Sequence, residues 1–147
     1  MSEQEPIEGV VAPTSQITKP PRALHRKYME PIFYLADRMC AVDGEVAPNE
    51  RRVLKELSEA GGVKAFRTTP TFRHLTVDSA CKSLDMTTAK NGAMVIMTLL
   101  LKADAERREA EHRFFSRVRE TLGMERVVVP VDFDEHKSLA LAYLRNS

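Results

Sequence analysis

The chain has 147 residues, with 22 lysines and arginines against 21 aspartates and glutamates. This length suits one compact domain with a real core and is too short for two ordinary domains. The near-zero net charge argues against general nucleic-acid binding, which normally shows a strong basic excess.

The first 20 residues are rich in Glu, Pro, Thr, Ser and Gln and show little apolar periodicity, which predicts a flexible tail. The alternative is an extended arm laid on the domain through Ile7, Val10, Val11 and Ile17. From Tyr28 to Val42 the apolar residues recur with helical spacing, and Pro31 fits the first turn of a helix. We expect this helix to end at Asp43 and Gly44.

A second helix is expected from Pro48 to Gly61 and Gly62, because glycine readily takes the left-handed conformation that ends helices. Asp78 is the predicted N-cap of a short helix, and Thr87 or Thr88 that of the next one. This next helix, to about Ala103, is apolar nearly all round. We therefore expect it to lie at the centre of the fold, wrapped by the others.

The last part of the chain holds two more expected helices, one from roughly Arg108 to Leu122 and one capped by Asp132 or Asp134. Between them, the run from Val127 to Val131 has the β-branched composition of an extended segment, but one short run does not make a sheet. The sequence therefore predicts six or seven helices without paired strands, an all-α single-domain bundle.

One stretch of the sequence occurs twice. Residues 35–62 align without gaps with residues 96–123, at a constant offset of 61. The identical pairs include Asp43 with Asp104, Glu45 with Glu106, Glu50 with Glu111, and Gly62 with Gly123. Because a repeat is one structural unit used twice and packed against itself, we expect two pseudo-symmetric halves with similar acidic loops.

The first acidic loop has part of the logic of a calcium-binding EF-hand loop. Gly44 would make the sharp turn, Val46 would pack inward and Glu50 would supply oxygen ligands. The two earlier ligand positions fall on Met39 and Ala41, which cannot coordinate, so one loop alone does not make a high-affinity site. Two loops brought together could share a hard divalent cation, and the candidate ligands are Asp43, Glu50, Asp104 and Glu111.

The alternative role of these carboxylates is structural. Asp and Glu at the start of a helix favour its positive dipole end and can satisfy unpaired N–H groups. In such solvated positions their pKa values would be ordinary.

These features resemble the TerB-like family of tellurite-resistance proteins. The resemblance covers roughly Tyr28 to Leu144, and its best part is the run from Ala41 to Glu50; the second copy, from Ala103 to Glu111, has Ala105 in place of the turn glycine. The family implies an all-helical domain, here residues 21–147, an acidic surface cluster thought to bind a divalent metal, and a role in tellurite-type chemical stress. It is not known as an enzyme family, and related domains occur fused to membrane-associated or chaperone-linked modules. Matching motif positions implies four metal ligands: Asp43, Glu50, Asp104 and Glu111.

No other constellation in the sequence points to chemistry. The four histidines lack zinc-type spacing, and no nucleophile elbow, Ser-His-Asp arrangement or phosphate-binding glycine loop is present. Cys40 and Cys81 lie in apolar contexts, which favours buried, reduced thiols. Six arginines between positions 107 and 126 are interleaved with glutamates, which favours a salt-bridged solvated face over a basic stripe for an anionic partner.

The leading hypothesis is therefore a non-enzymatic, metal-responsive accessory protein, whose cofactor would be Ca²⁺ or a similar divalent cation. The alternative is a metal-free helical protein–protein interaction module. In either case we expect a protein partner and no nucleic acid, with membrane association only through a partner. The N-terminus is acidic where a signal peptide is basic, and no apolar run approaches the ~20 residues of a membrane span, so the expected compartment is the cytoplasm.

Overall fold

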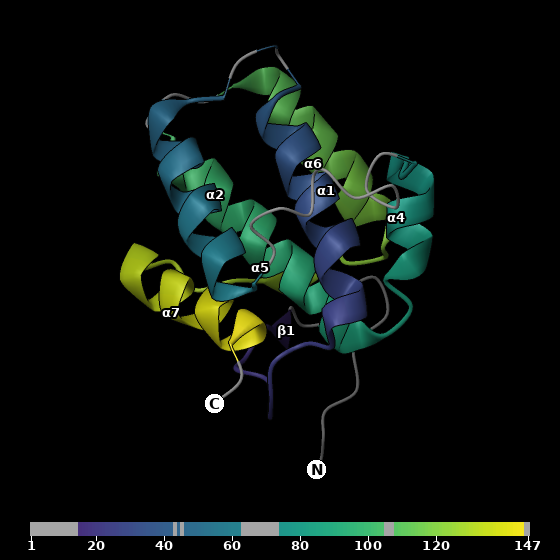
Figure 1. The fold of residues 1–147 in the computed structure, drawn as a ribbon, viewed down its shortest axis with the longest axis vertical. Helices are drawn as coiled ribbons and strands as arrows, with labels where there is room; N and C mark the ends of the chain where they lie inside the picture. The colour runs from purple at the N-terminus through teal and green to yellow at the C-terminus, as the bar shows by residue number, and fades with distance from the viewer. Residues whose placement is uncertain (1–14, 43, 45, 63–73, 105–107, 146–147) are drawn as a thin grey trace, which may run out of the picture.

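The computed structural model describes residues 15–42, 44, 46–62, 74–104 and 108–145. Within these ranges the chain forms six α-helices, one short 3-10 helix and two very short strands. In chain order they are β1 (Ser15–Gln16), η1 (Arg26–Tyr28), α1 (Met29–Cys40), α2 (Pro48–Ala60), α4 (Val77–Ser83), α5 (Thr87–Ala103), α6 (Glu109–Thr121), β2 (Val127–Val128) and α7 (Phe133–Leu144). The predicted all-α single-domain bundle is confirmed (Figure 1).

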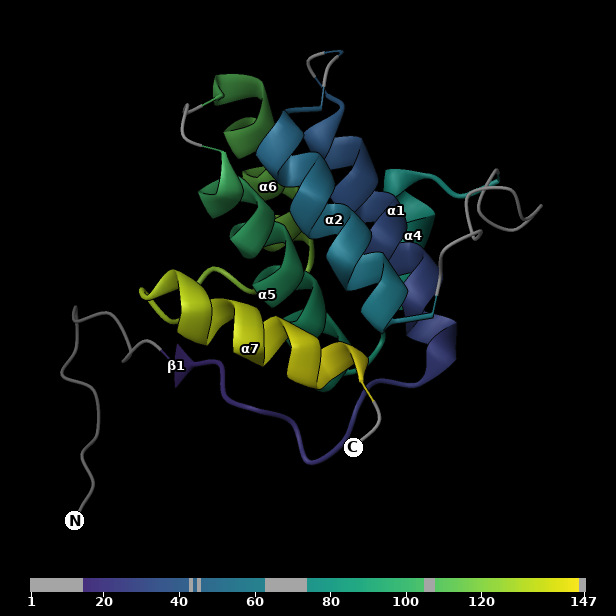
Figure 2. The ribbon, with the colours of Figure 1, turned by 60° about the vertical axis from the view of Figure 1, so that its left-hand side comes forward.

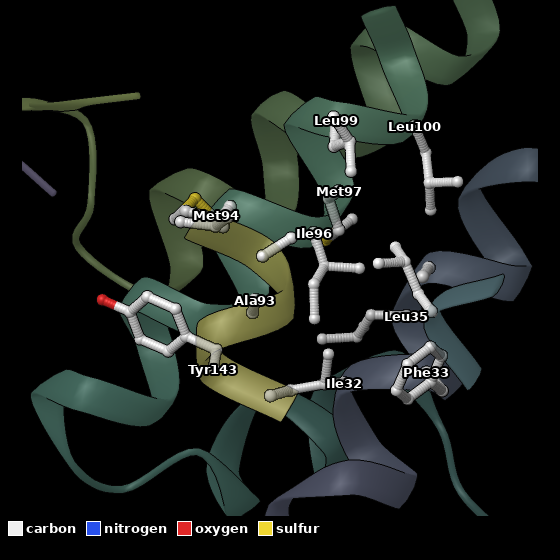
Figure 3. Packing of buried hydrophobic residues seen from close by; sticks show 14 of the residues in the cluster. Ile32, Phe33, Leu35, Ala93, Met94, Ile96, Met97, Leu99, Leu100 and Tyr143 are labelled. Atoms are coloured by element: carbon white, nitrogen blue, oxygen red, sulfur yellow. The ribbon is translucent and has the colours of Figure 1, made fainter. Parts of the chain in front are cut away.

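Helices α1 and α5 form the inner part of the bundle. On α5, residues such as Ala93, Ile96 and Leu100 are completely inaccessible to solvent. Figure 3 shows Ile32 and Leu35 of α1 pointing toward Ile96. Helix α5 also contacts α2, α6 and α7, so the prediction that it lies at the centre of the fold is confirmed.

Two amphipathic helices, α2 and α6, pack over the inner pair. Each has 13 residues, and they begin 61 residues apart, at Pro48 and Glu109. Each places a short apolar stripe against the core: Val53, Leu54 and Leu57 in α2, and Phe115 and Val118 in α6. Both are followed by a glycine in the left-handed region, Gly62 with φ +71° and Gly123 with φ +70°. The repeated sequence thus folds into repeated helix geometry.

The contacts between helices show the same symmetry. α1 contacts α2, α4 and α6, and α5 contacts α6, α7 and α2 in the corresponding way. α4 contacts α6 as α7 contacts α2, and α1 and α5 contact each other. Exchanging α1, α2 and α4 for α5, α6 and α7 leaves this pattern unchanged, as expected for two pseudo-symmetric halves. The ends of α1 and α5 and the starts of α2 and α6 lie at one end of the bundle (Figure 1, Figure 2).

The expectation of no paired strands is wrong in one detail. β1 and β2 pair in parallel, and Ile17 N–H donates to Val128 O at 2.9 Å. Ile17 is buried, so the N-terminal segment packs on the domain from Ser15 onward; residues 1–14 lie outside the described residues. The pairing joins positions as far apart as Ser15 and Val127, which is why no local pattern in the sequence indicated it.

In the first half, two helix boundaries differ from the prediction: the end of α1 and the start of α4. α1 ends at Cys40, and the turn that follows it includes Val42, which was expected to be helical. Thr76, and not Asp78, caps α4: Thr76 Oγ1 accepts a hydrogen bond from Ser79 N–H at 3.0 Å. Ser79 Oγ in turn accepts from Thr76 N–H at 2.9 Å. This reciprocal pair of bonds satisfies two N–H groups at once and fixes the helix start two residues earlier.

The remaining predicted N-caps are those of α5 and α7, in the second half. Met86 is the last extended residue before α5, so Thr87 is already helical, and neither it nor Thr88 caps the helix. Asp132 does cap α7, as predicted, because its Oδ2 accepts from Glu135 N–H at 2.9 Å.

Two expectations about thiols and membranes are also met in the structure. Cys40 and Cys81 are buried thiols, as predicted. Such thiols pack like small apolar side chains. None of the described helices combines the length and the apolar character that crossing a bilayer requires.

Candidate metal centre

Two glutamates hold equivalent positions in the two halves. Glu50 is the third residue of α2 and Glu111 the third residue of α6. A glutamate at this position can reach back to N–H groups at the helix start. Glu50 does so, since its Oε1 accepts a hydrogen bond from Ala47 N–H at 3.3 Å. Pro48 fixes this helix start, because its φ suits the first helical position. Local capping geometry thus directs the Glu50 carboxyl toward the preceding loop.

Three carboxylates meet at this end of the bundle. Asp104 directly follows α5, with an extended backbone. One carboxylate oxygen from each of Glu50, Asp104 and Glu111 lies within 4.8 Å of the other two. Glu50 and Glu111 are 0% and 1% exposed, and the Asp104 side chain is 9% exposed. Acidic side chains are almost never buried in this way unless a proton, a cation or a hydrogen-bond donor compensates them.

Neighbouring groups act on the Glu50 carboxyl of this cluster in opposite directions. Arg108, directly before α6, donates from Nε to Asp104 Oδ2 at 2.7 Å. Burial raises the pKa of Glu50 above its ordinary value, and the negative charge of Asp104 raises it further. Hydrogen bonding with Glu111 and Ala47 and the charge of Arg108 lower this pKa only in part. Within the described part of the chain, three ionised carboxylates would carry more negative charge than the single positive charge of Arg108 offsets.

The cluster contains a buried carboxylate oxygen that is left unsatisfied. Glu50 Oε2 is buried and has no hydrogen-bond partner among the described residues. Such an atom is costly unless a proton or a cation compensates it. Two oxygens on opposite sides of a Ca²⁺ ion are about 4.6–5.2 Å apart, twice the usual Ca–O distance. The three oxygens, all within 4.8 Å of one another, could therefore bind one ion without large rearrangement.

The structure brings together three of the four predicted ligands, Glu50, Asp104 and Glu111. The fourth, Asp43, lies outside the described residues. The expectation of a solvated carboxyl with an ordinary pKa is wrong for Glu50, which is buried and has a raised pKa. The physical reason is that the starts of α2 and α6 lie together at one end of the bundle (Figure 2), so each carboxyl is covered by the other half.

Arg108 is the residue of this site that sequence reasoning missed. The interleaved charges predict that Arg108 lies on a salt-bridged solvated face. In the structure Arg108 does form an ion pair, but this pair lies at the edge of the acidic cluster. The available signal was the spacing of four residues from Asp104 to Arg108, with the acid first. The matching position in the first half is Ala47, so this positive charge comes from the second half alone.

Comparison with protein-family models, curated proteins and solved structures finds no significant match to this chain. The resemblance to the TerB-like family therefore stays a prediction that depends on the sequence motifs. The repeat, the helical frame and the acidic cluster are properties of the chain itself.

Proposed function

We propose that this chain binds one divalent cation, Ca²⁺ or a similar oxygen-preferring ion, through Glu50, Asp104 and Glu111. The observation that carries the proposal is the convergence of two buried carboxylates, Glu50 and Glu111, with the partly buried Asp104, one oxygen of each lying within 4.8 Å of the others. Carboxylate oxygens are the ligands that such cations prefer. A bound cation would also give Glu50 Oε2 the partner that it lacks among the described residues.

The bound cation would link the two halves of the molecule. Glu50 belongs to the first half, whereas Asp104 and Glu111 belong to the second, so an ion held by all three ties α2 to α6. Asp43 is a candidate fourth ligand, because it is the repeat counterpart of Asp104. Cation binding would then stiffen one end of the bundle and change the surface offered to a protein partner.

The proposed biological role is that of a non-enzymatic accessory protein. The TerB-like resemblance of the run from Ala41 to Glu50 suggests tellurite-type chemical stress as its setting. The second candidate function is a metal-free helical interaction module. The bond from Ala47 N–H to Glu50 Oε1 favours this second function, because the same carboxyl serves as a helix cap. A proton held within the cluster would then take the place of the cation.

Isothermal titration with Ca²⁺, Mg²⁺ and Mn²⁺ tests the proposal. The variant E50Q/E111Q keeps the shape of both side chains and removes two charges from the cluster. The matched control is E59Q/E120Q, which makes the same change at exposed positions of α2 and α6. We expect wild type and control to bind one cation per chain, and E50Q/E111Q to bind about 100-fold more weakly or not at all, because affinity follows the number of charged ligands.

Thermal unfolding gives a second measure of the same binding. A cation at about 100 times its Kd should stabilise wild type and control by about 2.7 kcal/mol and leave E50Q/E111Q unchanged. Equal heats of binding for wild type and E50Q/E111Q would contradict the proposed ligands. Absence of both heat and stabilisation in every protein would favour the metal-free interaction module.

A further inference from the structure

Arg108 occupies an unusual place for a cation. It is the N-cap residue of α6, where the positive end of the helix dipole disfavours positive charge. Its side chain makes no capping hydrogen bond there. Nε donates instead to Asp104 Oδ2 at 2.7 Å, and the two side chains are only 24% and 9% exposed. The attraction of the acidic cluster therefore outweighs an unfavourable helix position.

The charge of Arg108 acts on Glu50 as well as on Asp104. Among the described residues, it is the cationic side chain whose charge acts on the buried Glu50 carboxyl. A guanidinium bound to a carboxylate forms a strong, charge-assisted hydrogen bond. Arginine also stays protonated under all ordinary conditions. The cluster thus has a permanent positive charge beside the place where a bound ion would act.

We infer that Arg108 is a built-in competitor for the cation: it holds Asp104 when no ion is bound and yields this carboxylate when a divalent ion binds. The inference rests on the proposed function. An ion that binds Asp104 must weaken the bond from Arg108, and it also meets the repulsion of the guanidinium. A monovalent ion brings no more charge than the guanidinium, whereas a divalent ion brings twice as much. Arg108 therefore selects divalent over monovalent cations and lowers the affinity for the divalent ones.

The repeat shows that this device is not a general feature of the frame. The position that matches Arg108 in the first half is Ala47, whose N–H donates to Glu50. In the first half, the donor to the Glu50 carboxylate is thus a neutral N–H group. In the second half, the donor to the Asp104 carboxylate is a charged guanidinium. Asp104 is the ligand on which the competition acts.

Calcium titration of four proteins by calorimetry tests the inference. R108Q removes the charge and keeps a polar side chain, whereas R108K keeps the charge and loses the fork geometry that suits a carboxylate. R117Q, at an exposed position of the same helix, is the matched control. We expect R108Q to bind Ca²⁺ about tenfold more tightly than wild type, R108K about threefold more tightly, and R117Q as wild type does.

The outcomes separate this inference from the proposed function. R108Q binding with wild-type or weaker affinity overturns the role of Arg108 and leaves the cation site standing. An equal gain in R117Q also overturns it, because the effect would then be one of overall charge. If no protein binds Ca²⁺, the site and the inference fail together. If R108Q does not fold, R108K decides, and an affinity at or below that of wild type counts against the inference.

Discussion

The two halves of this protein share a helical frame and differ in the loops that carry the acids. α2 and α6 have the same length, place Glu50 and Glu111 at the same position, and are followed by left-handed glycines. The first loop turns at Gly44, whose φ is +93°. The second contains Asp104 and Arg108, joined by an ion pair. The common frame thus positions two buried acids symmetrically, while the positive charge that acts on them among the described residues belongs to Arg108 of the second half.

The largest expected effect concerns the shared frame. Leu35 on α1 and Ile96 on α5 are repeat counterparts, and both are 0% exposed. Truncation removes buried methyl groups and leaves a cavity, so L35A and I96A should each lower the free energy of unfolding by about 4 kcal/mol. Urea unfolding followed by circular dichroism measures this change. V131A, at a position that is 92% exposed, is the control and should change stability by less than about 0.5 kcal/mol. A large loss in one variant and a small loss in the other would break the equivalence of the halves.

The frame could be predicted because its signals are local. Helix periodicity, the constant offset of 61 and the paired glycines predict α2 and α6 to within one or two residues. The cap of α4 was missed because Thr76 and Ser79 cap each other, a choice that depends on the conformation before the helix. The parallel pairing of β1 with β2 was missed because its partners are distant in the chain.

The site was only half predictable for a similar reason. The repeat singles out Glu50, Asp104 and Glu111, and the structure brings these three residues together. Their burial depends on how the starts of α2 and α6 meet, which no local pattern contains. The same holds for Arg108, whose role depends on the position of Asp104 relative to the start of α6.

The next largest expected effect is a loss of folding stability at low pH, which arises in the second half. His136 on α7 is fully buried, and its Nε2 lies 2.8 Å from Val95 O. Burial lowers the pKa of His136 from 6.5 to about 4, and the charge of Lys102 lowers it too, although the bond to Val95 O opposes this. The unfolded chain therefore takes up this proton at a higher pH than the folded one. The stability from neutral His136 is complete above pH 6.5 and falls by about 3 kcal/mol as the pH drops to 4.

Urea unfolding of wild type and H136Q between pH 7.5 and 4 measures this difference. Gln can still donate to Val95 O but does not titrate, so H136Q should lack this share of the acid-induced loss. Carboxylates titrate in both proteins, and the difference between the two curves isolates His136. The matching helix of the first half, α4, contains no histidine, so the effect should belong to the second half. Parallel curves over the whole range would contradict the prediction.

The smallest effect compares the two helix ends. Gly62 and Gly123 have φ of +71° and +70°, so an alanine at either position should cost about 1 kcal/mol of stability. A Cβ at position 62 would lie 3.2 Å from Arg26 Nη1, whereas nothing in the described part of the chain lies within 4 Å of a Cβ at position 123. Arg26 is exposed and its guanidinium can move, at the expense of its contact with Gly62 O at 3.4 Å. We therefore expect G62A to be less stable than G123A by a few tenths of a kcal/mol. The double variant should show the sum of the two losses, because the two sites share no partner among the residues that the structure describes. Wild-type stability of G123A in urea would mean that the helix end relaxes out of the left-handed conformation, and the similarity of the two ends would then not extend to their energetics.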